Sequence, residues 1–250
     1  MSALLGLSSI EILALIAITF VAGLVRGFSG FALSAMVMAS AVLILPPVEL
    51  IPICWWLEMG ASLLMVRGGW QDADRGVVKG LVIGSAIGVP LGLALTTSVS
   101  VETSALIALS LLIVLAGTQL VKLRLPFLAT TPGLYGSGLL AGIVTGLASV
   151  GGMVVALYVL ARDAPARQMR GSLVLYLFFS SLVSMGMLLA YGVMNLTATL
   201  RGFAFLVPTL CGVLLGQRLF TPKYEPYYKP FCLSLLIALA SIALGRTLLT

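Results

Sequence analysis

The chain has 250 residues, of which 60% are hydrophobic and only 9% are charged. A soluble domain averages about 25% charged residues, so this composition excludes an ordinary soluble enzyme and a disordered chain. The net charge is +6, but the basic residues fall in short segments between apolar runs, where they orient a chain in a membrane. The sequence therefore predicts a multi-pass membrane protein that has no nucleic-acid partner and almost no domain outside the membrane.

Charged residues, prolines and glycine clusters divide the chain into eight apolar runs. The runs cover residues 12–45, 50–66, 77–96, 104–121, 133–161, 172–191, 202–220 and 230–249. A membrane-spanning helix needs about 20 residues, and most runs have that length. The first run is too long, because as one straight helix it would measure ~50 Å against a hydrocarbon core of ~30 Å. The fifth run is also longer than a single span requires.

Both long runs have a glycine-rich centre. The first contains Gly23-Leu-Val-Arg26-Gly27-Phe-Ser29-Gly30, and the fifth contains Gly142-Ile-Val-Thr-Gly146-Leu-Ala-Ser149-Val-Gly151-Gly152. Glycine at this density breaks or bends a helix. Each long run is therefore predicted to form two short half-helices joined by a glycine-rich break.

The two halves of the chain repeat this pattern. Gly23-x-x-x-Gly27 matches Gly142-x-x-x-Gly146, and Gly88-Val-Pro-Leu-Gly92 matches Gly212-Val-Leu-Leu-Gly216. The predicted fold is all-α, with a first repeat over residues 1–125 and a second over residues 126–250. Each repeat consists of a broken helix (12–45 or 133–161) that forms a re-entrant hairpin, followed by three membrane spans.

Basic residues set the predicted topology. If each broken helix returns to the side it came from, each repeat crosses the membrane three times and the second repeat is inverted. One side then holds 11 of the 14 Lys and Arg residues: Arg67, Arg75, Lys79, Lys122, Arg124, Arg162, Arg167, Arg170, Arg218, Lys223 and Lys229. Because basic loops stay in the cytoplasm, both termini are expected outside.

In this topology the two hairpin tips approach the middle of the membrane from opposite sides, an arrangement typical of secondary transporters. The second arm of each hairpin begins near Gly30 or Gly152, and a helix N-terminus favours an anion. Serine hydroxyls and an arginine guanidinium suit the oxygens of sulfite, sulfonate or carboxylate. The predicted substrate-binding residues are Arg26, Gly27, Ser29, Gly30, Ser149, Gly151 and Gly152.

Several of these residues have a structural interpretation as well. Arg26 is interpreted as an anion contact in preference to an ion pair with Glu58, so Arg26→Ala is expected to abolish binding and leave the fold intact. Glu58 serves either proton coupling or gating, or else neutralises Arg26, and both remain open. Trp55 and Trp56 either line the cavity or pack against neighbours. Close helix packing is preferred for Gly80, Gly84, Gly88 and Gly92.

Two segments carry a family resemblance. Ala22-Gly-Leu-Val-Arg26-Gly-Phe-Ser-Gly-Phe31, followed by Pro46-Pro47, and Gly138-Leu-Leu-Ala-Gly142-Ile-Val-Thr-Gly146-Leu-Ala-Ser-Val-Gly151-Gly152 resemble the two repeat motifs of the sulfite exporter TauE/SafE family, or toluenesulfonate uptake permease family. The resemblance implies a bacterial inner-membrane transporter of sulfite, sulfonates or related organosulfur anions, commonly working outward. One departure is Ala32, where family members often carry glycine.

The resulting hypothesis is a secondary transporter, an exporter of organosulfur anions, that works by alternating access. The chain contains no ATP-binding motif such as GxxxxGK(S/T), which argues against primary pumping by this polypeptide alone. No metal site is expected, because the chain has no His and its three Cys are not in a CxxC spacing. No cofactor is expected either. The alternatives are an anion channel and an intramembrane enzyme. The expected partners are a small anionic substrate and membrane lipids, and proton coupling and a homodimer are left open.

Overall fold

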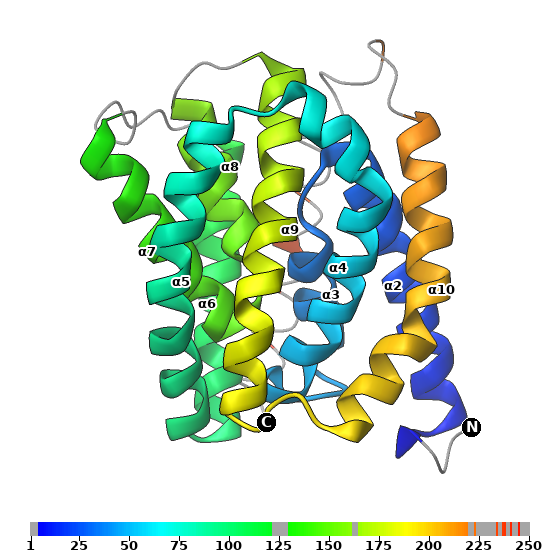
Figure 1. Ribbon diagram of the computed structural model, residues 1–250. Helices are drawn as coiled ribbons and strands as arrows, with labels where there is room; N and C mark the ends of the chain where they lie inside the picture. The colour runs from blue at the N-terminus through cyan, green and yellow to red at the C-terminus, as the bar shows by residue number, and fades with distance from the viewer. Residues whose placement is uncertain are drawn as a thin grey trace.

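The computed structural model describes residues 5–121, 130–161 and 165–219, and beyond them residues 223, 234, 237, 238, 241 and 245. These stretches form helices and contain no strand, which confirms the all-α prediction for them. The helices are α2 (Ser9–Ser29), α3 (Leu33–Ala41), α4 (Pro47–Asp72), α5 (Arg75–Ser98), α6 (Val101–Leu120), α7 (Thr131–Ala148), α8 (Gly151–Ala161), α9 (Ala166–Ala190) and α10 (Leu196–Leu219) (Figure 1). The predicted last span, 230–249, lies outside the continuously described residues.

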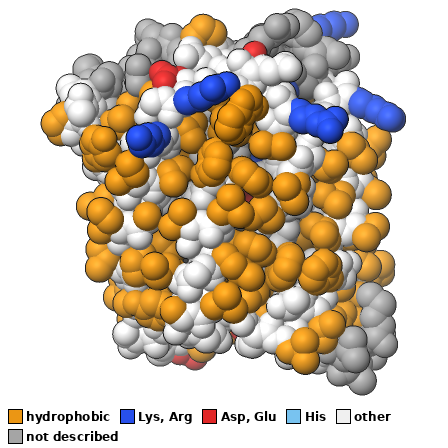
Figure 2. Space-filling model, viewed as in Figure 1, with side chains coloured by type: hydrophobic (Ala, Val, Ile, Leu, Met, Phe, Trp, Pro, Cys, Tyr) orange, Lys and Arg blue, Asp and Glu red, His pale blue; other side chains and the backbone are white. Residues whose placement is uncertain are grey.

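Five of the described helices are long and apolar enough to cross a membrane. They are Ser9–Ser29, Pro47–Asp72, Arg75–Ser98, Gln168–Ala190 and Leu196–Leu219. Hydrophobic side chains cover most of the face drawn in Figure 2, and Lys and Arg side chains gather near one end of it. This distribution fits a bundle whose sides face lipid and whose basic end faces water.

The helix breaks fall near the glycine motifs, as predicted, but the two arms are unequal. α2 has 21 residues and α3 has 9, while α7 has 18 and α8 has 11. The expected pair of short half-helices is therefore wrong for the first arm of each hairpin. In the first run the reason is that Gly23 and Gly27 stay helical, and of the three glycines only Gly30, with φ 80°, lies in the break.

Each hairpin turns back on itself. α2 and α4 both begin at the end of the bundle where the N-terminus lies, while α7 and α9 begin at the opposite end (Figure 1). The turns use the left-handed backbone conformation, at Gly30 and Ala32 in the first hairpin and at Ser149, with φ 56°, in the second. Non-glycine residues rarely adopt this conformation, so Ala32 and Ser149 are held there by the surrounding packing.

Glycines let two pairs of helices approach closely. A Cβ atom added to Gly88 or Gly92 would overlap a carbonyl oxygen of α7, and one added to Gly84 would also lie against the α7 backbone. This confirms the packing interpretation of the α5 glycines. In the same way, Gly23 and Gly27 of α2 lie directly against the backbone of α10.

Candidate functional site

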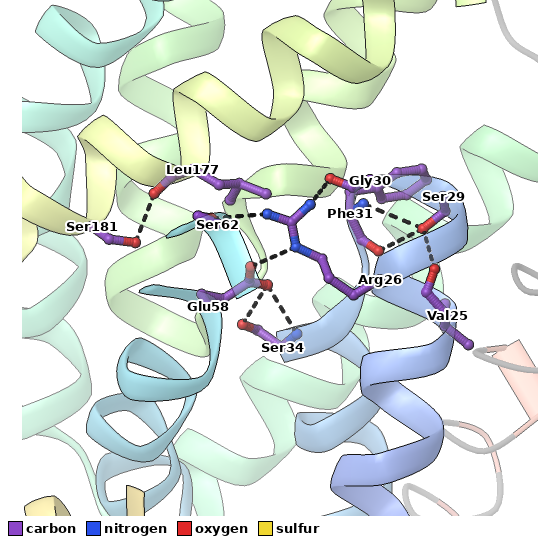
Figure 3. A network of polar contacts seen from close by, with 10 residues as sticks. All are labelled: Val25, Arg26, Ser29, Gly30, Phe31, Ser34, Glu58, Ser62, Leu177 and Ser181. Carbon is purple, nitrogen blue, oxygen red and sulfur yellow. Dashed lines mark hydrogen bonds and ion pairs between the residues drawn. The ribbon is translucent and has the colours of Figure 1, made fainter. Parts of the chain in front are cut away.

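A buried ion pair lies at the centre of the bundle. Arg26 in the last turn of α2 donates from Nε to Oε2 of Glu58, in the middle of α4, at 3.0 Å. Its guanidinium also donates to the hydroxyl of Ser62 at 3.0 Å and to the carbonyl oxygen of Gly30. Figure 3 shows this network, in which Arg26 is fully buried. The ion pair with Glu58, which was the structural interpretation of Arg26, is therefore present.

The second oxygen of Glu58 caps the first turn of α3. Oε1 accepts hydrogen bonds from the backbone N–H of Ser34 at 3.3 Å and from the Ser34 hydroxyl at 3.0 Å. Ala32, at the N-cap of α3, provides no side-chain cap. A carboxylate is stabilised at a helix N-terminus by the helix dipole and the exposed N–H groups. The position expected for the substrate anion at α3 is thus taken by a carboxylate of the chain itself.

The remaining residues of the first tip hold its turn together. The Ser29 hydroxyl donates to the carbonyl oxygens of Val25 and Phe31, at 2.9 and 2.7 Å. Arg170, near the start of α9, lies against Gly30 and donates to the carbonyl oxygen of Gly27 at 2.7 Å. These contacts give Gly27, Ser29 and Gly30 a role in closing the first turn.

The second tip opens on a small cavity instead. This α8 cavity has a volume of about 30 Å³ and lies beside the first residues of α8, Gly151 and Gly152. Its polar lining consists of Glu58, Thr145, Ser149, Ser180, Ser181 and Ser184. A water molecule needs about 10–15 Å³ on this measure, so the cavity has room for about two.

The structure therefore brings together only part of the predicted site. Ser149, Gly151 and Gly152 share the α8 cavity with Glu58, whereas none of the four residues of the first tip lines it. Gly30 lies beside Arg170 and Gly152 lies beside Leu177. Those two residues of α9 are separated by about 10 Å along the helix. The two tips do not meet at one point, and the Arg26–Glu58 pair lies between them.

The two tryptophans behave differently. Trp55 lines the α8 cavity and donates from Nε1 to the carbonyl oxygen of Ser181 at 2.7 Å. Trp56 instead packs on Phe203, with ring centroids 4.5 Å apart, and lies against Gly202 of α10. Trp55 thus matches the cavity interpretation and Trp56 the packing one.

The serines of α9 that line the cavity were not among the predicted site residues. Ser180 contacts the Ser85 hydroxyl at 3.1 Å, and the hydroxyl of Tyr176 donates to Ser85 at 3.3 Å. The available signal was the group Ser180-Ser181-x-x-Ser184 in an otherwise apolar span, which places Ser180 and Ser184 on one helix face. Its position opposite α8 depends on tertiary packing, which the pattern does not contain.

Two larger pockets lie at opposite ends of α4 and α9. The α9-start pocket, of about 320 Å³, is lined by residues including Asp72, Arg170 and Gln217. The α9-end pocket, of about 440 Å³, is lined by residues including Asn195, Glu49 and Arg201, and the last two form an ion pair. The residues that α4 and α9 contribute to the α8 cavity come from the middle of each helix, so the cavity lies between the two pockets along both helices.

These features define a multi-pass helical membrane protein with a buried polar centre. The chain belongs to the sulfite exporter TauE/SafE family, whose sequence model matches residues 15–242. This confirms the resemblance, and membership in this transporter family indicates export of a small sulfur-containing anion. Comparisons with curated proteins and with solved structures gave no match. Among the described residues, no group of three or more His, Cys, Asp and Glu side chains could hold a metal ion.

Proposed function

We propose that the protein is a secondary transporter that exports sulfite or a sulfonate by alternating access, with the substrate held in the α8 cavity. The observation that carries this proposal is the composition of that cavity. A helix N-terminus, where backbone N–H groups lack helical acceptors, is lined by Ser149, Ser180 and Ser184 in the middle of an apolar bundle. Gly151 and Gly152, the first two residues of α8, both line the cavity at this N-terminus.

The size of the cavity supports a carrier that changes conformation. An oxyanion such as sulfite is larger than the two water molecules for which there is room. Binding of sulfite therefore requires α4 and α9 to separate, so that the cavity enlarges and opens toward one end of the bundle at a time. In the proposed cycle the substrate enters the cavity from the pocket at one end of α4 and α9 and leaves through the pocket at the other end.

Arg26 and Glu58 provide the coupling. With Glu58 ionised, the pair is neutral and its carboxylate repels an anion in the adjacent cavity. Protonation of Glu58 would leave the charge of Arg26 uncompensated, and an incoming anion would restore neutrality. The substrate anion and a proton on Glu58 would therefore bind together. In this scheme Arg26 does not line the cavity, and its positive charge attracts the anion from the far side of Glu58.

The inverted-repeat organisation belongs to the same proposal. α2 packs on α10 through glycines, and α7 packs on α5 through glycines, as expected if residues 1–125 and 126–250 are equivalent units. The basic residues Arg67, Arg75 and Lys79 lie on the last turns of α4 and the first turns of α5. By the positive-inside rule this end faces the cytoplasm of a bacterial inner membrane, and the N-terminus faces the periplasm.

The test of the site is sulfite flux in proteoliposomes containing the variant Ser149→Ala/Ser180→Ala. A hydrogen bond to a charged group contributes about 1.5–3 kcal/mol, so the loss of one donor raises the KM for sulfite at least tenfold. Ser137→Ala is the control, because Ser137 on α7 is buried as Ser180 on α9 is, but Ser137 does not line the cavity. An unchanged KM in the double variant would remove the α8 cavity from the substrate path.

The test of coupling is Glu58→Gln, which keeps an oxygen for Arg26 but cannot exchange a proton. Sulfite flux through the wild-type protein should respond to an imposed pH gradient, and flux through Glu58→Gln should not. A pH-gradient response of equal size in both proteins would contradict the coupling role.

A further inference from the structure

A groove outside the transport path lies on the side of the bundle between α4, α5 and α9. Its volume is about 290 Å³, and its floor consists of Val78, Val82, Ile83, Leu175 and Phe179. Val78 and Leu175 are buried, whereas Ile83 is 43% exposed, so the groove opens outward from the bundle. In a membrane this opening faces the acyl chains of lipids rather than water.

Cations line one end of the groove. Arg75 and Lys79 are exposed and lie one helical turn apart on α5. The Arg75 guanidinium lies 4.9 Å from the ring centroid of Trp70, and the Trp70 and Phe179 rings are 6.4 Å apart. The nearby Asp74 does not line the groove, and its Oδ1 accepts from the backbone N–H of Val77 as the N-cap of α5. The net charge offered to a ligand here is positive.

The position of this end fits a lipid headgroup. Arg75 opens α5, and Figure 2 shows that Lys and Arg side chains gather at one end of this face, with hydrophobic side chains beyond them. Tryptophan at this level is typical of the membrane–water interface. From Arg75 to Ile83 the groove extends by about 12 Å along α5, which takes it from the headgroup region into the hydrocarbon.

We propose that this groove binds one anionic phospholipid, with its phosphate between Arg75 and Lys79 and an acyl chain along Val82, Ile83 and Phe179. The two cations match the phosphate headgroup of the phospholipid, and the apolar floor of the groove matches its acyl chain. A zwitterionic lipid would bring a third cation to the same end, so the groove selects a headgroup with net negative charge, such as phosphoglycerol.

The experiment measures binding of phosphatidylglycerol with brominated acyl chains to the purified protein in detergent, through quenching of tryptophan fluorescence. Wild-type protein should bind it at least tenfold more tightly than brominated phosphatidylcholine. Arg75→Gln/Lys79→Gln should weaken phosphatidylglycerol binding about thirtyfold, with little effect on phosphatidylcholine. Trp70→Phe should remove most of the saturable quenching.

The matched control is Arg67→Gln/Arg218→Gln, which removes two exposed charges from the end of α4 and of α10 without touching the groove. It should bind phosphatidylglycerol within twofold of wild type. An equal loss in both double variants, or equal affinity for the two lipids, would overturn the proposal. Glycerol 3-phosphate competing as well as the intact lipid would also overturn it, because it would indicate a simple phosphate site. If Arg75→Gln/Lys79→Gln does not fold, Lys79→Glu provides the same comparison.

Discussion

Replacing Arg26 with methionine should destabilise the protein strongly. The substitution removes three hydrogen bonds from a fully buried guanidinium and leaves the Glu58 carboxylate, 7% exposed, without its cation. Breaking a buried ion pair by removing one partner costs about 3–5 kcal/mol. For a chain of this size, that loss corresponds to a fall in melting temperature of roughly 6–20 °C. Arg26→Ala is therefore no longer expected to leave the fold intact.

The assay is thermal unfolding in detergent of Arg26→Met, Glu58→Gln and the double variant. Because a neutral buried pair needs no counter-charge, the double variant should recover most of the stability that Arg26→Met loses. Sulfite transport by the recovered double variant then isolates the functional effect of the charge from its structural one. Arg26→Met with the wild-type melting temperature, or a double variant no more stable than it, would refute the reasoning.

Two further predictions concern backbone geometry and are checked by the same unfolding assay. Ala32→Gly should raise stability by about 0.5–1 kcal/mol, because it relieves the left-handed strain at φ 76° against a smaller entropic cost; a lower melting temperature would contradict this. Gly88→Ala should destabilise by about 2 kcal/mol or more, because the added methyl group overlaps the carbonyl oxygen of Leu139. The control is Gly186→Ala on α9, where a Cβ atom would meet no neighbouring helix within 4 Å, so this variant should be neutral or stabilising. Equal changes in melting temperature for the two variants would exclude the packing explanation.

The helices and their breaks were largely predictable, because hydropathy and glycine content are local properties of the sequence. The position of the break within the first run could not be predicted. Gly23 and Gly27 look as disruptive as Gly30 in the sequence, but their missing side chains accommodate α10 and the helix continues through them. The position of the second break was harder still to predict, because the residue in the left-handed conformation there is Ser149 rather than a glycine.

The candidate site was only partly predictable for a similar reason. Arg26 and Glu58 were recognisable as unusual charges in apolar runs, but their separation by 32 positions in the sequence does not determine whether they meet. Ser149 was found because it adjoins a glycine motif. Ser180 and Ser184 were not, because a serine in a span is most often a packing residue and only the tertiary contact with α8 distinguishes them.

The glycine contacts between α2 and α10 also bear on how the protein is made. The face of α2 that carries Gly23 and Gly27 packs against Thr209 and Val213, which follow about three quarters of the chain later in the sequence. Because α2 is synthesised before α10, its glycine face has no packing partner in the membrane until α10 has been synthesised and inserted. A chain that ended before α10 would leave this glycine face of α2 exposed to lipid and free to pack against other helices with small residues.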